Sequence, residues 1–136
     1  MVNYTNAQFR SILFGLGYLA KDAAKPGLGY PVTTDNSALT GPRTLQAIKN
    51  FQSDFQLLSD GVVGSKTMAK AAEVIRILQH ELNLVVDAGL TLNQPFYGPK
   101  TVASVKNFQG LIDVAQTGIA TIELRVQLDE IAKAQV

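Results

Sequence analysis

Apolar residues recur every three or four positions in five stretches of the chain, which is the spacing that places them on one face of a helix. The first helix is expected over about residues 6–20, because Thr5 and Gln8 can form a capping box at its start. Others are expected after Gly41, Ser65 and Gly98, and a last helix runs to the C-terminus. No stretch alternates between apolar and polar residues for long enough to be a strand. The pattern therefore predicts an all-α protein.

Gly-Pro pairs mark the starts of two of these helices. Pro42 and Pro99 would each be the first helical residue, where the N–H that proline lacks would have no partner in any case. The third helix, with Ser65 as its expected N-cap, contains no glycine, proline or turn cluster before Asn83. One long helix is therefore expected in the middle of the chain.

The chain repeats part of its own sequence. The twelve residues that begin at Gly41 recur from Gly98, 57 residues later, and seven of the twelve are identical. Similarity over this length indicates a duplicated module. We expect two tandem repeats of about three helices each, residues 1–72 and 73–136, which share the long central helix and pack as one body. The first repeat carries a nine-residue insertion in its first loop.

Composition narrows the chemistry that the chain can perform. Twelve basic and 11 acidic residues give a net charge of +1, and no run of Lys or Arg marks a nucleic-acid surface. Cysteine is absent and His80 is the one histidine, which argues against a thiolate nucleophile and a usual catalytic zinc site. The glutamates on the predicted helices are expected to be solvated. We therefore expect no enzyme activity, cofactor or metal, and no apolar run reaches the ~20 residues of a membrane helix.

Two further motifs connect the chain to a known family. Residues 60–67 read Asp-Gly-Val-Val-Gly-Ser-Lys-Thr, and each Gly-Pro-Arg/Lys-Thr segment opens a helix that continues to Phe-Gln. Together with the Leu-Gln segment of residues 77–82, these motifs resemble the peptidoglycan-binding module of type 1. The resemblance covers about residues 9–128, and the second copy departs from it where Thr117-Gly118 replaces Asp-Gly. It implies a non-catalytic three-helix module that binds bacterial cell-wall peptidoglycan, usually alongside a wall-cleaving enzyme.

A wall fragment offers sugar hydroxyls, amides and carboxylates, so its site needs donors, acceptors, a cation and an aromatic face. The loops before the Gly-Pro pairs supply such groups, and the free N–H groups of the helix starts could attract a carboxylate. The candidate ligand-binding residues are Tyr30, Asp35, Asn36, Arg43 and Asp60 in the first repeat and Asn93, Gln94, Tyr97 and Lys100 in the second. Structural roles compete with these: solvated charges for Arg43 and Lys100, and turn formation for Asp60. Gln52 and Gln109 are expected to bond loop backbone.

The sequence predicts binding of peptidoglycan or a muropeptide. The alternative is a protein-interaction scaffold that keeps the fold without binding the wall, and the altered Asp-Gly loops favour it. The resemblance implies a location in the cell wall or periplasm, although no export signal is evident in the sequence.

Overall fold

The computed structural model describes residues 3–135, which form five α-helices and one short 3-10 helix. The elements are α1 (Asn6–Gly15), η1 (Lys21–Ala23), α2 (Pro42–Asp54), α3 (Ser65–Val86), α4 (Pro99–Leu111) and α5 (Ile122–Lys133). No β-strand occurs in residues 3–135, and the predicted all-α class is confirmed.

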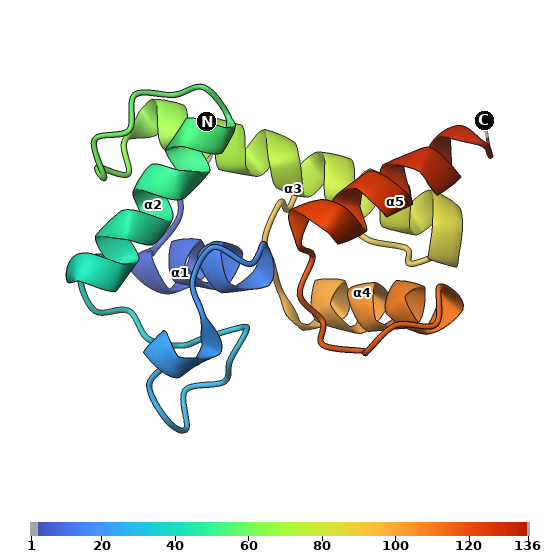
Figure 1. Cartoon of the computed structure of the whole chain (residues 1–136), viewed down its shortest axis with the longest axis horizontal. Helices are drawn as coiled ribbons and strands as arrows, with labels where there is room; N and C mark the ends of the chain where they lie inside the picture. Colours follow the sequence, from blue (N-terminus) through green and yellow to red (C-terminus); the bar gives the residue numbers. More distant parts are fainter. Residues whose placement is uncertain (1–2, 136) are drawn as a thin grey trace.

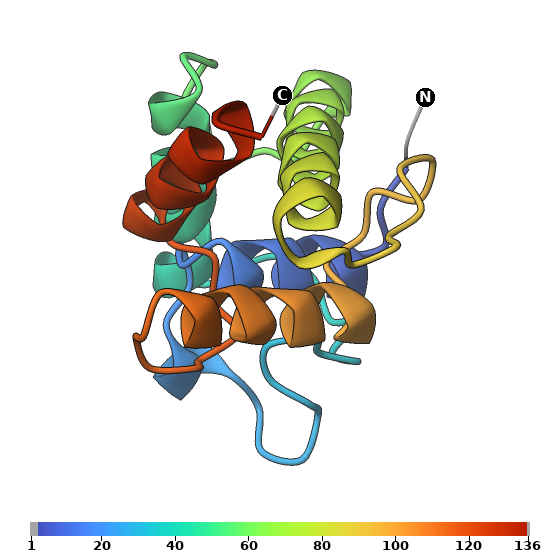
Figure 2. The ribbon, with the colours of Figure 1, turned by 90° about the vertical axis from the view of Figure 1, so that its right-hand side faces the viewer.

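The 22-residue helix α3 connects the two halves of the molecule. It runs across the structure with α2 near its beginning and α4 and α5 beside its later part (Figure 1). Turning the molecule by 90° shows α1 and α4 below α3 (Figure 2). Helix α3 packs against both α4 and α5, and α1 packs against α2. The long central helix expected from the sequence is confirmed.

The first helix is shorter than expected. Its capping box forms, since the Gln8 N–H donates to Thr5 Oγ1 over 3.1 Å and the Thr5 N–H donates to Gln8 Oε1 over 2.9 Å. The helix ends at Gly15 instead of near residue 20, because Gly17 takes a left-handed conformation with φ of 84°. Leu16 and Leu19 remain buried beyond the helix end, so their apolar spacing reflects burial in an irregular segment.

The N-cap of α3 also differs from the prediction. Gly64 holds this position with an extended backbone, and no side chain caps the helix start. Ser65 is instead the first helical residue.

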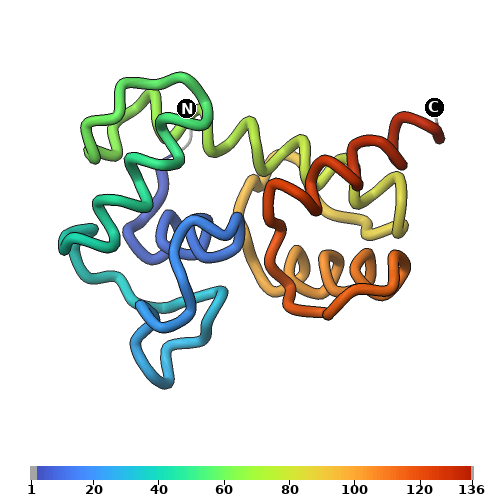
Figure 3. Tube along the Cα trace, in the orientation of Figure 1, coloured from blue at the N-terminus to red at the C-terminus, as the bar shows by residue number. Residues whose placement is uncertain are grey.

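The segment between α1 and α2 hangs below the helices as a long loop (Figure 3). The buried Arg10 side chain of α1 holds it, donating to the carbonyls of Asp35 over 2.6 Å, Ser37 over 3.1 Å and Ala38 over 2.9 Å. Asn36 adds a bond from the other side, because its Oδ1 accepts from the Ala7 N–H over 3.0 Å. The loop is thus fixed onto α1 by one buried cation and one helix-start bond.

A glutamine at the end of α2 fastens the turn that follows. Gln52 Oε1 accepts from the Gly61 N–H over 3.0 Å, and Nε2 donates to the Val62 carbonyl over 3.0 Å and to Asp60 Oδ1 over 3.1 Å. The buried Gln52 side chain therefore satisfies the turn's polar groups and holds α2 against it.

The same arrangement occurs 57 residues later, at the end of α4. Gln109 Oε1 accepts from the Gly118 N–H over 2.9 Å, and Nε2 donates to Thr117 Oγ1 over 2.9 Å and to the Ile119 carbonyl over 3.4 Å. The Thr117 hydroxyl thus replaces the Asp60 carboxylate as the acceptor. The expectation that both glutamines bond loop backbone is confirmed, and the departure from Asp-Gly leaves the turn intact.

The two halves meet where the chain passes close to Gly15. The Ala120 N–H donates to the Gly15 carbonyl over 2.7 Å. The ring of the buried Tyr97 lies against Gly15, so that a Cβ built there would be 2.4 Å from Tyr97 Cδ1. The Tyr97 hydroxyl donates to the Gly118 carbonyl over 2.5 Å. We call these contacts of Gly15, Tyr97 and Ala120 the seam; they require a residue without a side chain at position 15.

The seam predicts whether one substitution, Gly15→Ala, raises or lowers the stability of the protein. Gly15→Ala should destabilise the protein by about 1–3 kcal/mol, because the new methyl group would overlap the Tyr97 ring. Helix propensity alone predicts the reverse, a gain of about 0.5–1 kcal/mol for alanine in a helix. Urea unfolding followed by circular dichroism distinguishes the two.

Gly64→Ala is the control, because a Cβ at Gly64 would have no atom within 4 Å and its φ is −98°. It should change the free energy of unfolding by less than about 1 kcal/mol. A Gly15→Ala variant as stable as the wild type, or more stable, would show that the seam does not constrain the packing.

Candidate functional site

A groove of about 460 Å³ lies at the start of α4, and we call it the α4 groove. This volume is within the range of small-ligand sites. The groove combines a helix start, the preceding loop and one residue of α3. Its lining residues are Gln79, Gly89, Leu90, Thr91, Gln94, Phe96, Gly98, Pro99, Lys100 and Thr101.

The helix start gives the groove a positive end. Gly98 is the N-cap and Pro99 the first helical residue, as the sequence predicts, and no side chain caps this end. The N–H groups of the first turn therefore have no intrahelical partner and attract an anion. Lys100 is exposed, and no ion pair within residues 3–135 involves it. The lining residues include no carboxylate that would oppose this charge.

Gln79 lines the same groove, and its side chain has an unpaired acceptor within the described residues. Its side chain is 3% exposed, and Nε2 donates to the backbone carbonyls of Gln94 over 3.1 Å and Phe96 over 3.4 Å. Because both partners are acceptors, they fix the orientation of the amide. Oε1 is left buried without a hydrogen-bond partner within the described residues. An unmet buried acceptor is costly, which makes Gln79 a candidate for contact with a ligand.

The loop that forms the groove wall is held from both sides. Asn83 on α3 bonds Leu90 twice, accepting its N–H over 2.7 Å and donating to its carbonyl over 3.0 Å. Tyr4, near the N-terminus, donates to the Pro95 carbonyl over 2.7 Å, and its ring meets Phe96 edge-on at 5.8 Å between centroids. Burial raises the pKa of the Tyr4 hydroxyl to about 12, so it remains a donor at neutral pH. The groove wall is therefore held in place by one residue from each half of the chain, Asn83 and Tyr4.

The start of α2 is built differently, although its sequence is similar. Arg43, which occupies the place of Lys100, pairs with Asp22 in η1. Leu13 occupies the place of Gln79 and is fully buried, and its side chain carries no acceptor. The two helix starts therefore offer different chemistry to a ligand.

The other candidates of the first repeat have structural partners. Tyr30 is half-buried with its ring edge-on to Phe14 at 5.0 Å. The Asp35 carboxylate is buried, where it accepts from Ser37 Oγ over 2.6 Å and lies 3.7 Å from Arg10 Nη1. Hydrogen bonds from Ser37 lower the pKa of Asp35, with Arg10 and Lys25 adding to the effect.

Asp60 is exposed and accepts from the Val62 N–H over 3.0 Å, and this bond lowers its pKa. Together with its bond from Gln52 Nε2, this contact gives Asp60 the hydrogen-bond partners of a turn former. Asn36 has a structural partner too, because its Oδ1 accepts from the Ala7 N–H in the first turn of α1.

Of the candidates in the second repeat, the structure brings Gln94 and Lys100 together in the α4 groove. Asn93 is exposed on the preceding loop. Tyr97 needs correction as a ligand residue, because its side chain is 2% exposed and its hydroxyl is bonded to Gly118. Its place directly before Gly98 suggested a surface position, whereas the chain turns inward there to form the seam.

Sequence reasoning missed Gln79, Leu90 and Phe96 as groove residues. A signal for Gln79 was present in the repeat, since a polar residue stands there on the buried face where the first copy has Leu13. Leu90 and Phe96 carry no comparable signal, because loop residues have no periodicity from which their position can be inferred.

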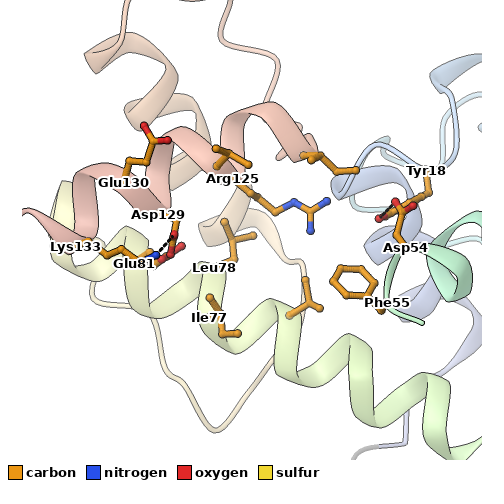
Figure 4. Close-up of a pocket in the computed structure, with 13 residues that line it drawn as sticks. Tyr18, Asp54, Phe55, Ile77, Leu78, Glu81, Arg125, Asp129, Glu130 and Lys133 are labelled. Carbon is orange, nitrogen blue, oxygen red and sulfur yellow. Dashed lines mark hydrogen bonds and ion pairs between the residues drawn. The ribbon is translucent and has the colours of Figure 1, made fainter. Parts of the chain in front are cut away.

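A second groove of about 650 Å³ lies between α3 and α5 and reaches the end of α2. Apolar residues of both helices form much of it, including Ile77 and Val126, which are each about half exposed. Tyr18 and Asp54 close one end, with the Tyr18 hydroxyl donating to Asp54 Oδ2 over 2.7 Å. Glu81, Asp129 and Lys133 lie at the other end (Figure 4).

Glu81 keeps its proton to a higher pH than a solvated glutamate does. Burial raises its pKa to about 7, helped by its hydrogen bond with Asp129 and by the negative charge of that residue. Lys133 lies 2.8 Å from Asp129 Oδ2 and opposes the rise. The glutamates were expected to be solvated, and for Glu81 this is wrong, because its side chain faces α5.

Among residues 3–135, no three histidine or acidic side chains are grouped in a way that could hold a metal ion. Nor does any helix in that range combine the length and apolar character that a membrane crossing requires.

The described residues thus form a small all-α structure with one groove at the start of α4 and another between α3 and α5. Residues 15–71 match the model of a protein family described as "Putative peptidoglycan binding domain". The match runs from the end of α1 to the first part of α3, and for this segment it confirms the resemblance seen in the sequence. No curated protein and no solved structure matches the chain.

The Glu81 environment predicts how stability depends on pH. Its pKa is about 7 in the folded state against an ordinary value of 4.5, so the folded state binds the proton more tightly. The resulting stability is present below about pH 4.5 and is lost as the pH rises through 7. The free energy of unfolding of the wild type should fall by about 1 kcal/mol between pH 5 and pH 8. This is less than the shift in the pKa of Glu81 would give at full strength, because the groove is open to solvent.

Glu81→Gln should remove this loss, since the amide can donate to Asp129 at every pH. Glu130→Gln changes a carboxylate of the same groove that is exposed, and it should keep the wild-type slope. Thermal unfolding at both pH values measures the difference. If stability fell equally with pH in the wild type and in Glu81→Gln, Glu81 would not be the cause of the loss.

Proposed function

We propose that the protein binds bacterial cell-wall peptidoglycan without catalysing its cleavage, and that the α4 groove is its main contact. The match of residues 15–71 to a peptidoglycan-binding family supports the ligand, and the α4 groove lies outside this matched segment. The groove supports the position, because it combines free helix-start N–H groups, an unpaired lysine and an unmet buried acceptor. Such a module would act alongside a wall-cleaving enzyme.

The proposal includes a tandem pair of modules, residues 1–72 and 73–136, that share α3. The repeated Gly-Pro helix starts and the glutamine bonds at the ends of α2 and α4 support the duplication. In a tandem pair, one copy can keep the ligand site while the other supports it. Here Arg43 is paired with Asp22 and Lys100 is not, so we assign the main site to the second copy.

Other candidate residues remain part of the proposal as outer contacts. Asn93 and Gln94 lie on the loop that forms the groove wall and are exposed. Tyr30 presents part of its ring on the loop between α1 and α2, with Lys21 Nζ 5.9 Å from the ring centroid. These side chains could contact sugar or peptide beyond the groove.

Co-sedimentation with purified sacculi tests the function. The wild type should pellet with the wall material, and Lys100→Ala should lower the bound fraction at least threefold at low salt, because it removes the groove's one lysine. Arg43→Ala is the matched control at the other helix start and should bind like the wild type.

Two results would contradict the proposal. No sedimentation of the wild type would favour the protein-interaction scaffold instead. Loss of binding in Arg43→Ala but not in Lys100→Ala would place the contact at the start of α2.

A further inference from the structure

We propose that the α4 groove recognises the free carboxylate at the end of a peptide together with the amide N–H that precedes it. This inference rests on the proposed function, and it identifies the terminus of the stem peptide, and not the glycan, as the part of the wall that enters the groove.

The carboxylate is assigned to the helix start. The first-turn N–H groups after Gly98 have no capping side chain, and the ammonium group of Lys100 belongs to the same lining. Backbone N–H groups at a helix start bind carboxylates through charge-assisted hydrogen bonds. Because no acidic residue lines the groove, a ligand carboxylate would meet no like charge there.

The amide N–H is assigned to Gln79. A helix start and a lysine would accept any anion, but the buried Gln79 Oε1 can only be satisfied by a donor. Its amide cannot turn over to serve as a donor itself, because the Gln94 and Phe96 carbonyls hold Nε2. The ligand must therefore carry an acceptor group and a donor group close together, as the last residue of a peptide does.

The shape of the groove favours a peptide over a sugar ring. Leu90, Pro99 and the partly exposed Phe96 provide apolar surface for a small side chain. A Cβ built at Gly89 or at Gly98 would have no atom within 4 Å, so the groove is open beside both glycines. The terminal D-alanine of a stem peptide, with its methyl group, fits these requirements.

Calorimetric titration with three small probes tests the inference without altering the protein. The probes are N-acetyl-D-alanyl-D-alanine, its C-terminal amide, and the ester analogue in which oxygen replaces the N–H of the last residue. The free acid should bind, and each analogue should bind at least about tenfold more weakly. The amide loses the carboxylate, whereas the ester loses the donor to Gln79.

Two substitutions locate the binding. Lys100→Met should weaken binding of the free acid at least about fivefold, because it removes the cation and keeps the length of the side chain. Arg43→Met is the matched control in the first half and should leave the affinity unchanged. Circular dichroism of both variants checks that each remains folded.

Equal affinity for the free acid and the amide would overturn the carboxylate assignment, and equal affinity for the acid and the ester would overturn the role of Gln79. Sedimentation of the wild type with sacculi together with no binding of the free acid would overturn this inference and leave the wall-binding function standing. Binding of the free acid at Lys100 without sedimentation would support the carboxylate site and contradict the wall-binding function.

Discussion

The contact between Gly15 and the Tyr97 ring fixes how the two halves of this protein lie against each other. A side chain at position 15 would occupy the space of the ring, and the bond from the Ala120 N–H to the Gly15 carbonyl closes the same seam. With Tyr97 held inward, Gly98 and the start of α4 follow at a fixed position. Tyr4 then secures the adjoining loop through Pro95. The first half thus builds part of the groove that the second half presents.

The two halves share the hydrogen bonds that hold a helix end to the turn after it, and they differ at the starts of α2 and α4. The bonds of Gln52 to its turn recur at Gln109, even though a threonine hydroxyl replaces a carboxylate as the acceptor. At the helix starts, by contrast, Arg43 pairs with Asp22, whereas Lys100 forms no ion pair with any residue that the structure describes. A structural role tolerates the exchange of one acceptor for another, whereas a ligand site depends on which groups are left without a partner. This difference is the physical reason for assigning the ligand to the second half.

Much of the fold could be predicted from the sequence, since helix starts depend on local chemistry. The capping box at Thr5 and the Gly-Pro starts of α2 and α4 follow from adjacent residues, and the continuity of α3 follows from the lack of breakers. The end of α1 and the burial of Tyr97 could not be predicted, because they depend on contacts between distant segments. The candidate site could be predicted only in part. Lys100 and Gln94 were predicted because they lie beside a Gly-Pro pair. Gln79 was not, because the lack of a hydrogen-bond partner for its Oε1 is visible only in the folded structure.

We propose that the protein binds wall material at the start of α4 and not at the equivalent start of α2. The most direct measurement is an NMR titration of the isotope-labelled protein with soluble fragments of muramidase-digested peptidoglycan, following the backbone amide signals. We predict that the largest shifts occur in the amides of residues 89–91, Gly98, Lys100 and Thr101, with little change in those of Gly41, Arg43 and Thr44. Shifts concentrated in residues 41–44, or none at saturating fragment, would contradict the account.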